Sequence, residues 1–379
     1  MHLRSLVLEN FRCYERVELR FARGLNAVLG PNASGKTTIL EAIYLLSTTT
    51  SPRSGSAKEM IRHGESWARV TGVFTVRDRD LTMRMTLGDP SGGRSGRKTI
   101  EVDGREIASR RRAVGRVQSV LFWIGELEVV KGPPSERRSF LNQAIGQMSA
   151  RYLDDLARYR RALRQRNELL KEIARGGRNG RALAPWTRTL VEAGAAITID
   201  RAEYLAALGS ESSALHERLG VGAEALSVNY APSVGVSGNE EDVTRAFHET
   251  LAQMHDREVE RGSTQTGPHR DDVTLAIDDV DLRRFGSQGQ QRTAALALKL
   301  AQARVARART EDQPILLLDD CLSELDVNRC GAMLDLSHDH EQMIVTSACC
   351  PEELERRLAD ARVITTDGTS ADCGYARAD

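Results

Sequence analysis

Long hydrophobic runs are absent from this sequence of 379 residues. No stretch reaches the ~18 consecutive apolar residues that a membrane-spanning helix needs, so we expect no membrane partner. The first eight residues, MHLRSLVL, also lack the longer apolar segment and the small-residue cleavage site of a signal peptide. The sequence therefore predicts a cytoplasmic protein.

Closely spaced cysteine pairs of the form C-x-x-C are absent as well. The six cysteines are too few to staple a chain of this length with disulfides. We expect reduced thiols that mostly pack in the interior, at Cys13, Cys321, Cys330, Cys349, Cys350 and Cys373.

An excess of charge of either sign is the third absence. Lysine plus arginine and aspartate plus glutamate both number 53, so the formal net charge is zero. Any nucleic-acid surface must therefore come from a local cluster of charge. The length itself allows a full hydrophobic core and more than one lobe.

A phosphate-binding loop is the clearest motif present. The segment GPNASGKT at positions 30–37 has the spacing G-x-x-x-x-G-K-T. Gly30 and Gly35 let backbone N–H groups turn toward phosphate oxygens, and Lys36 reaches the β- and γ-phosphates. This spacing indicates a nucleoside triphosphate site.

The flanks of the loop favour this interpretation over a chance glycine-rich turn. Residues 25–29 are typical of a short buried strand, and residues 38–46 have helical spacing with one apolar side. The helix N-terminus would then point at the anion, and the Thr37 hydroxyl would bind Mg²⁺.

Two acids at positions 319 and 320 supply the second half of a hydrolytic site. They follow four apolar residues, ILLL at 315–318, as expected for a buried parallel strand that ends at the carboxyl edge of a sheet. We assign Asp319 to Mg²⁺ and Asp320 to the orientation or deprotonation of the attacking water. Many strands end in acids, so this motif gains its meaning from the phosphate loop.

A polar, glycine-bearing segment, SQGQQR at 287–292, precedes an alanine- and leucine-rich helix over residues 293–304. The N-terminus of such a helix is suited to bind an anion. Because a single copy of the chain offers this segment no ligand, we interpret it as the half of a composite site that a second copy completes. The sequence thus predicts an ATP-dependent homodimer.

The pattern of the chain changes near residue 135. Before it, alternating segments predict strands, and the glycine-rich run 88–98 predicts a hairpin or loop. After it, apolar residues at intervals of three and four predict one long helix to Ala174, and a second helix begins near Pro185. About 27 helical residues at 1.5 Å each would make an antiparallel arm roughly 40 Å long.

This arm carries an uneven charge. Eleven basic and four acidic residues lie between Arg151 and Arg188. They form either a solvated helix face or a surface that contacts the phosphate backbone of DNA. The candidate DNA contacts are Arg158, Arg161 and Arg164, together with Arg111 and Arg112 of a second basic run.

Over nearly its whole length the chain resembles the RecF family, ABC-type ATPases related to the SMC and Rad50 branch. The resemblance rests on ENFR at 9–12, the phosphate loop with LEA at 40–42, IRHGE at 61–65, VKGPPSERR at 130–138, TGPHRDD at 266–272, SQGQQR at 287–292 and LDDCLSELD at 318–326.

The resemblance implies an α/β fold in which mixed sheets surround the phosphate-loop core. Residues 1–130 and 264–379 would form this ABC-type head, and residues 131–263 an inserted helical arm. ATP and Mg²⁺ would be the cofactors, with Asp320 and Lys36 as catalytic residues and with Thr37 and Asp319 on the metal. The matching nucleotide-binding positions are Arg12, Gly30, Asn32, Ala33, Ser34, Gly35, Lys36, Thr37 and Thr38, with Ser287 and Gln290 reaching the opposite subunit. Ser323 and Asp326 match the loop that links the two sites.

The chain departs from the family pattern at three places. The usual Ser-Phe-Arg segment is Ser-Pro-Arg here, which leaves the role of Arg53 open. No glutamine-loop residue can be aligned, and Gln118 is a nearby candidate. The switch histidine is missing, with Thr346 and Ser347 as the two candidates in its place.

The family resemblance implies an ATP-dependent, DNA-binding recombination mediator. The ATP-bound dimer would bind gaps or junctions of single- and double-stranded DNA and, with RecR and RecO, load RecA in fork maintenance, gap repair and SOS induction. Because Asp320 stands where most ABC ATPases have glutamate, we expect slow hydrolysis that resets a switch.

Three other classes fit less well. A transporter ATPase subunit has its second motif much closer to the phosphate loop, and a long-armed chromosome-structuring ATPase needs a far longer insert. A fused nuclease would need another acidic metal cluster, for which Asp271, Asp272, Asp278 and Asp279 are the candidates.

Overall fold

The computed structural model describes residues 1–90, 98–123, 127–177, 179–219, 224–322, 327–335, 339–348, 352–358, 361–367 and 371–375. The chain folds into two compact units. Unit 1 comprises Met1–Leu127, Ala214–Glu224 and Arg292–Asp379, and unit 2 comprises Glu128–Ser213 and Ala225–Gln291. The expected division into an ATPase head (1–130 and 264–379) and an arm (131–263) stays a prediction.

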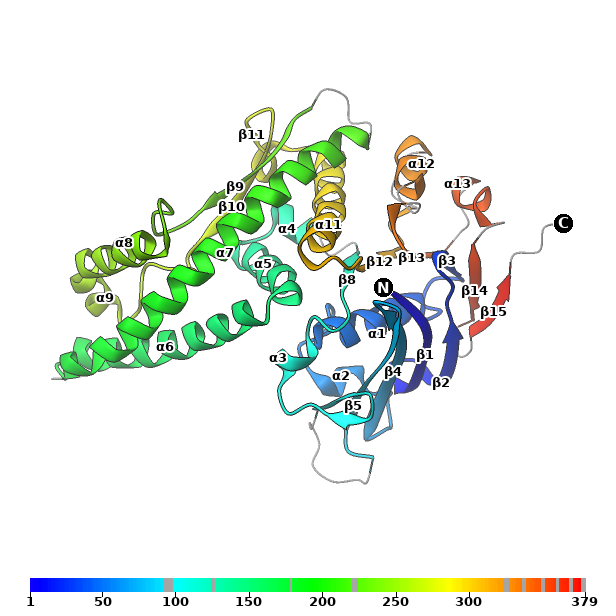
Figure 1. The fold of residues 1–379 in the computed structure, drawn as a ribbon, viewed down its shortest axis with the longest axis horizontal. Helices are drawn as coiled ribbons and strands as arrows, with labels where there is room; N and C mark the ends of the chain where they lie inside the picture. Colours follow the sequence, from blue (N-terminus) through cyan, green and yellow to red (C-terminus); the bar gives the residue numbers. More distant parts are fainter. Residues whose placement is uncertain are drawn as a thin grey trace. The chain divides into compact units, whose positions relative to one another are not determined.

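An antiparallel sheet forms one layer of unit 1 (Figure 1), with the strand order β2-β1-β4-β5-β6-β7. Its strands are β1 (His2–Phe11), β2 (Tyr14–Arg20), β4 (Trp67–Val76), β5 (Arg79–Gly88), β6 (Lys98–Val102) and β7 (Arg105–Glu106). Buried residues alternate with exposed ones along most of β2 and with half-buried ones along β4, which confirms the strands predicted there from alternation. The strands β5 and β6 pair antiparallel, while the predicted loop between them lies largely outside the described residues.

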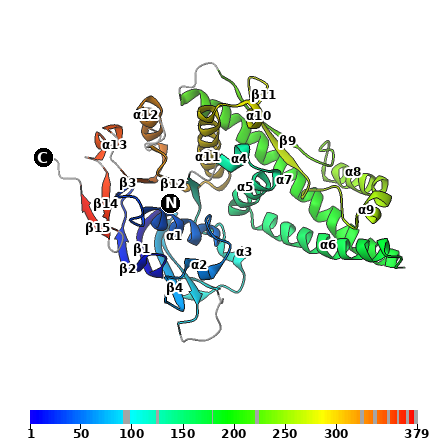
Figure 2. The same ribbon diagram turned by 180° about the vertical axis from the view of Figure 1, so that it is seen from behind.

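A second, mainly parallel sheet carries the candidate site. Its strand order is β15-β14-β3-β13-β12-β8. Figure 2 shows the molecule from behind, with β15, β14, β3 and β12 of this sheet labelled. Its strands are β3 (Gly24–Leu29), β8 (Ser119–Phe122), β12 (Ile315–Asp319), β13 (Gln342–Ser347), β14 (Arg362–Thr366) and β15 (Ala371–Tyr375). All but β15 run parallel to their neighbours. The residues that follow β3, β8, β12 and β13 therefore meet at one edge of the sheet.

Helix α1 (Lys36–Thr48) lies between the two sheets of unit 1. One hydrophobic core joins its side chains to residues of β1, β4 and β5 and to Leu121, Ile315, Leu317 and Ile344 of the parallel sheet. The prediction of a single apolar side was wrong, because Leu40, Tyr44 and Leu45 are buried as well. A helix apolar all round belongs in a core, and here that burial fixes the end that begins at Lys36.

The remaining helices of unit 1 are short, apart from the end of α11. They are α2 (Ala57–Met60), α3 (Arg110–Ala113), α12 (Val327–Asp335) and α13 (Glu352–Glu355). Helix α11 (Gln288–Thr310) begins in unit 2 and continues into unit 1. None of the helices in the described ranges is long and apolar enough to span a membrane.

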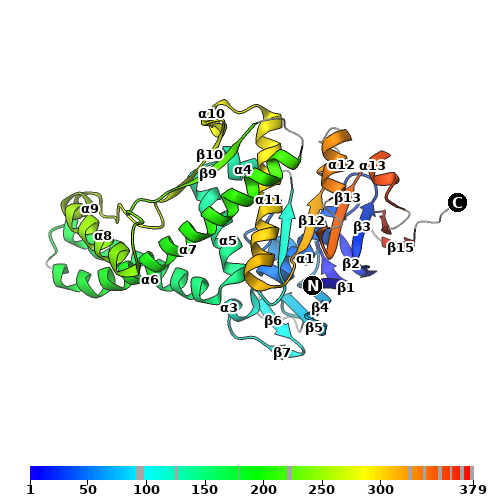
Figure 3. The ribbon, with the colours of Figure 1, turned by 45° about the horizontal axis from the view of Figure 1, so that its top comes forward.

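Unit 2 is built on two long helices, α6 (Ala150–Ala174) and α7 (Leu183–Arg218), which run beside each other in Figure 3. Its other helices are α4 (Glu128–Lys131), α5 (Pro134–Met148), α8 (Glu240–Gln253), α9 (His255–Arg261) and α10 (Leu282–Phe285), with a short 3₁₀ turn at Asn179–Ala182. A small antiparallel sheet has the order β11 (Val280–Asp281), β10 (Asp272–Ile277), β9 (Leu226–Ala231).

The predicted single helix from residue 135 to Ala174 is two helices. Ser149 is extended, with φ −136° and ψ 109°, and its side chain accepts a hydrogen bond from the Tyr152 N–H. Serine is a favoured N-cap, so it ends α5 and starts α6 although the apolar spacing continues across it. The α6 segment alone is about 38 Å long at 1.5 Å per residue.

Candidate functional site

The loop between β3 and α1 adopts a phosphate-binding form. Gly35 is the N-cap of α1 and has φ 88°, a backbone conformation open to glycine. A Cβ on Gly35 would lie 2.5 Å from the Tyr14 hydroxyl, and one on Gly30 would lie 2.4 Å from the Thr366 carbonyl oxygen. Both glycines are therefore required by close packing behind the loop.

Lys36 folds back over the loop. Its Nζ donates hydrogen bonds to the carbonyl oxygens of Gly30 at 2.7 Å and Pro31 at 2.8 Å, and the side chain is largely buried. The ammonium is thus held over the concave side of the loop. It can exchange these neutral acceptors for phosphate oxygens, which form stronger charge-assisted bonds.

Asp319 lies at the centre of a hydroxyl cluster at the carboxyl edge of the parallel sheet. Its Oδ1 accepts hydrogen bonds from the hydroxyls of Thr37 at 2.9 Å and Thr346 at 2.8 Å. Thr346 stands opposite Asp319 in the β12–β13 register. Of the two switch candidates, Thr346 therefore reaches the acid, while Ser347 is buried at the end of the same strand.

Burial raises the pKa of Asp319 above its ordinary value, against hydrogen bonds from Thr346 and Thr37 that lower it. Its carboxylate and the Thr37 hydroxyl are hard oxygen donors of the kind that Mg²⁺ prefers, with remaining positions left to water and phosphate. A divalent cation would stabilise the ionised carboxylate that burial disfavours. The residues present therefore fit the metal.

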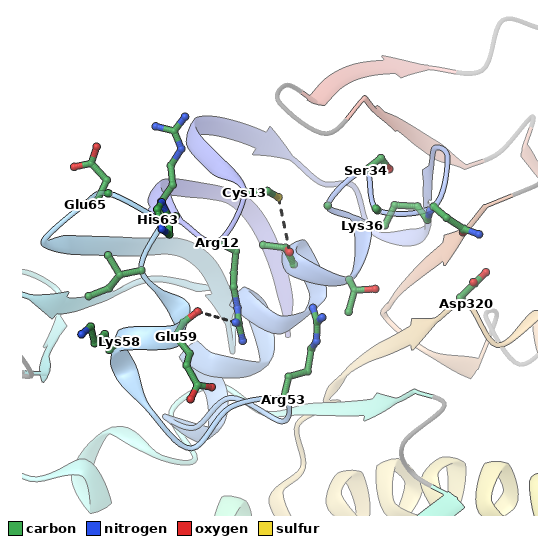
Figure 4. A pocket seen from close by; sticks show the side chains of 18 residues that line it. Arg12, Cys13, Ser34, Lys36, Arg53, Lys58, Glu59, His63, Glu65 and Asp320 are labelled. Carbon is green, nitrogen blue, oxygen red and sulfur yellow. Dashed lines mark hydrogen bonds between the residues drawn. The ribbon is translucent and has the colours of Figure 1, made fainter.

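Asp320 leaves the strand in a left-handed conformation, with φ 51°. Its N–H donates to the Thr346 hydroxyl at 2.9 Å and to the Thr346 carbonyl oxygen at 3.2 Å, which hold this backbone in place. Left-handed backbone is uncommon outside glycine and is enriched at functional sites. The Asp320 side chain lines the same pocket as the loop residues, and Figure 4 labels it there with Lys36.

Lys36, Thr37 and Asp320 border a pocket of about 930 Å³ within unit 1. Every predicted phosphate-loop position after Gly30 lines it, with Arg12 and Asp320. The lining residues that sequence reasoning did not assign are Cys13, Arg53, Lys58, Glu59, Ile61, Arg62, His63, Gly64 and Glu65. The volume suits a nucleotide-sized ligand.

One buried carboxylate organises the arginines of this pocket. Glu41 of α1 accepts bidentate hydrogen bonds from Arg12, at 3.0 Å from Nε and 2.6 Å from Nη2, and has no exposed side-chain surface. It also accepts the Ser51 hydroxyl and lies 3.8 Å from Arg53. The third Arg12 nitrogen donates to the Glu59 carbonyl oxygen, as drawn in Figure 4. Arg12 is therefore part of the pocket wall. The sequence signal for its partner Glu41, which was missed, is an acidic residue among the apolar residues of α1.

Ser287 and Gln290 form a capping box at the start of α11, within unit 2. The Ser287 hydroxyl oxygen accepts from the Gln290 N–H at 3.2 Å, and the Gln290 Oε1 accepts from the Ser287 N–H at 2.9 Å. In this box the Ser287 hydroxyl oxygen and the Gln290 side-chain oxygen both act as acceptors. The predicted signature thus has a structural role as well as a chemistry suited to anions.

Three other predicted positions have different outcomes. Ser323 and Asp326 lie outside the described residues. Gln118 was a wrong candidate for the glutamine loop, because it precedes β8 and so lies at the amino edge of the sheet, bonded to Thr310 and to the Ile315 N–H. Trp123, which follows β8 at the opposite edge of the sheet, lines a small cavity together with Thr37 and Asp319.

The basic residues of the arm divide into structural and surface groups. Arg166 is 3% exposed and binds Glu258 at 2.7 Å, together with two threonine hydroxyls, so it belongs to the core of unit 2. Arg158 pairs with Asp155 at 3.3 Å and Glu192 at 3.4 Å. Arg161 and Arg164 are exposed on α6, and in unit 1 Arg111 and Arg112 are exposed on α3.

Two of the four acids weighed for a nuclease, Asp271 and Asp272, are held by arginines. Asp271 bonds Arg201 at 3.3 Å, the Ser233 hydroxyl and Tyr230, and Asp272 bonds Arg137 at 2.6 Å. Asp278 lies in a turn, where it accepts from the Ala225 N–H. The described part of the chain holds no group of three or more His, Cys, Asp or Glu side chains arranged for a metal. Their contacts assign Asp271 and Asp272 to the framework of unit 2.

Comparison with known proteins gives consistent matches. The family described as the RecF/RecN/SMC N terminal domain matches residues 2–357. The DNA replication and repair protein RecF of Geobacillus thermodenitrificans is 39% identical over 350 residues, which cover 92% of each chain. A solved structure of the recombination mediator protein RecF with ATP, in the RecFOR pathway, superimposes with a TM-score of 0.89 at 30% identity, covering 98% of this chain and 97% of that one.

A more distant solved structure shares the fold alone. The Smc head domain of Pyrococcus furiosus has a TM-score of 0.57 at 17% identity and covers 99% of this chain and 96% of that one. The likeness agrees with the mixed sheets around the phosphate loop, so the α/β, ABC-type head predicted from the sequence is confirmed. The chain belongs to the RecF family, in the branch of ABC-type ATPases that contains the SMC proteins.

Proposed function

We propose that the protein is an ATP-dependent DNA-binding protein of replication and repair. The observation that carries the proposal is the juxtaposition of Thr37, Asp319, Thr346 and Asp320 at the mouth of the phosphate loop. A relative named as a DNA replication and repair protein and a solved structure of the recombination mediator protein RecF with ATP support it.

In this proposal the loop backbone and Lys36 bind the β- and γ-phosphates. Thr37 and Asp319 hold Mg²⁺, which when bound neutralises charge on the phosphate oxygens. Arg12 and Arg53 form the positively charged wall of the same pocket, and Glu41 keeps them in place.

Asp320 is the proposed general base. Its fixed backbone directs the carboxylate into the pocket, where it orients the attacking water and accepts its proton. Aspartate is one methylene shorter than glutamate, and Thr346 provides a hydroxyl where a histidine would provide a second base. Hydrolysis is therefore slow, and the protein uses ATP as a switch.

Ser287 and Gln290 complete the site from a second copy. The ATP-bound protein is then a homodimer with two nucleotides at its interface. We keep Ser323 and Asp326 as the linking loop, residues 1–130 and 264–379 as the ATPase head, and residues 131–263 as the arm.

The partner of the dimer is DNA. Arg161 and Arg164 on α6, with Arg158, Arg111 and Arg112, are the proposed phosphate contacts. As the family resemblance implies, the dimer would act in the cytoplasm at gaps or duplex–single-strand junctions, with RecR and RecO, to load RecA during fork maintenance, gap repair and SOS induction.

DNA binding at two salt concentrations, with and without ATP, tests the proposal. A gapped duplex should bind more tightly with ATP and Mg²⁺, and the affinity should fall steeply as salt rises. Equal affinity with and without nucleotide would overturn the ATP switch, and an affinity independent of salt would overturn the phosphate contacts.

A further inference from the structure

Phe285 is an aromatic side chain displayed to solvent. It is 72% exposed, the largest exposure among the big apolar side chains of the described residues. The others with more than a third of their surface exposed are Val327 at 66%, Val280 at 52% and Val236 at 37%. Aromatic side chains contribute large apolar area to interfaces and are enriched at their energetic centres.

The segment that presents Phe285 is firmly built. Asp281 caps α10 by accepting from the Arg284 N–H at 2.9 Å, and Leu282 is buried beneath the turn. The Leu282 carbonyl oxygen accepts from the Gly286 N–H and from the Gln291 side chain, each at 3.1 Å. Phe285 is therefore exposed on a turn that several hydrogen bonds hold in place.

Gly286 shows how tightly this turn is packed. A Cβ at Gly286 would lie 2.5 Å from both Leu282 Cδ1 and the Leu282 carbonyl oxygen. On the other side of α10, the Arg283 Nε donates to the Lys131 carbonyl oxygen at 3.2 Å. The Asp281 cap and the close packing at Gly286 thus hold the ring of Phe285 two residues before Ser287.

We infer that Phe285 is an apolar anchor of the ATP-dependent contact with a second copy of this chain, seated at the rim of that copy's phosphate pocket. The inference rests on the proposed composite site, which brings Ser287 to the partner's phosphates. Two residues span about 7 Å at most, so a surface reached by Ser287 is also within reach of Phe285.

Two observations select this occupant. Val327 immediately follows the segment 323–326, the other motif assigned to the subunit contact, so exposed apolar side chains flank both motifs in the described structure. The pocket wall in the described residues offers a matching surface, since its lining includes the aliphatic Ile61 and the cationic side chains of Arg53, Lys58 and Arg62. An aromatic ring packs on an aliphatic side chain and is attracted by cations over its face.

Dimerisation of the full chain with Mg²⁺ and adenylyl imidodiphosphate tests the anchor. Phe285→Ser should raise the protein concentration for half-dimerisation at least tenfold, while each monomer binds nucleotide with unchanged affinity and melts at an unchanged temperature. Phe285→Leu should restore most of the dimer. Val236→Ser, which removes an exposed apolar side chain far from both motifs in sequence, should change nothing.

A photo-crosslinking residue at position 285 locates the contact. With nucleotide it should join two copies, and the joined peptide should come from residues that line the pocket, such as 58–65. Crosslinking without nucleotide, or to peptides outside the pocket lining, would overturn the inference, as would normal dimerisation of Phe285→Ser. A wild-type chain that stays monomeric with nucleotide would instead refute the proposed composite site, so the two failures can be told apart.

Discussion

Ser287 and Gln290 cap each other at the start of α11, with 2.9 Å and 3.2 Å between their bonded atoms. The pair satisfies two backbone N–H groups at the start of the helix through its two side-chain oxygens. A glutamate at position 290 would complete the same box. Glutamine therefore suits a site that meets phosphate.

Negative charge introduced into this box separates its role as a helix cap from its proposed role in contacting phosphate. Ser287→Asp retains a good N-cap, and Gln290→Glu retains the capping box, so the melting temperature should change little. Both carboxylates would face the γ-phosphate of the partner, and ATP-dependent dimerisation should be lost. Sedimentation with Mg²⁺ and ATP measures this, with Gln253→Glu, the same change at an exposed residue outside the 287–292 segment, as the control. Dimers of normal affinity in both variants would show that the box does not meet phosphate.

Asp320→Asn should separate hydrolysis from binding. The amide keeps the size of the side chain but cannot accept the proton of water, so turnover should fall by about 10²–10⁴-fold. Nucleotide affinity and dimerisation should persist. The wild type itself should turn over well below about 10 per second with saturating DNA. Steady-state phosphate release measures both rates, and a wild-type rate of many tens per second would contradict the slow switch.

The raised pKa of Asp319 gives a prediction for the nucleotide-free protein. A carboxyl whose pKa is raised in the folded state contributes stability below its unfolded pKa, near the ordinary 3.8, and loses that contribution as pH rises through the folded pKa. Asp319→Asn should therefore melt higher than wild type at pH 7, and the difference should shrink as pH falls toward 3.8.

Nucleotide should reverse this order. Mg²⁺ and ATP should stabilise the wild type and leave Asp319→Asn almost unchanged, because the variant lacks the ionised ligand. Thermal melting across pH, with and without Mg²⁺ and ATP, checks both parts. A lower melting temperature for the variant at pH 7 without nucleotide would contradict the buried, unfavourable charge.

Arginines on the same helix should differ in their contribution to DNA binding. Replacing Arg161 and Arg164 with alanine should lower the slope of log affinity against log salt by roughly 2, since each phosphate contact contributes about 0.9. Arg158→Ala should have a smaller effect, because Asp155 and Glu192 already pair with its guanidinium. Fluorescence anisotropy over a salt series measures the slopes. Equal slopes for wild type and the double variant would place the DNA elsewhere.

The parts of the site that could be predicted are those whose residues lie close together in the sequence. The loop 30–37 and the strand that ends at Asp319 are each continuous in sequence, so their geometry follows from a few neighbouring residues. The role of Thr346 depends on the register of β13 against β12, which no local pattern specifies. Glu41 was missed for a related reason, because its partners Arg12 and Ser51 come from separate segments.

The fold shows the same division. Alternation identified β1, β2, β4 and β5 of the antiparallel sheet but not the short β6 and β7. The burial of α1 on all sides depends on two sheets that meet only in the folded unit. Ser149 caps α6 and so separates it from α5, and the apolar spacing, which continues across Ser149, gave no sign of this break.

The central claim is that the phosphate loop of one copy and the signature of another form one site, and a mixing experiment tests it most directly. Lys36→Ala spoils the loop, Ser287→Asp spoils the signature, and a heterodimer of the two retains one intact composite site. Native mass spectrometry with Mg²⁺ and ATP should find each variant monomeric alone and a heterodimer in the mixture. Dimers of either variant alone, or a mixture that stays monomeric while the wild type dimerises, would contradict the claim.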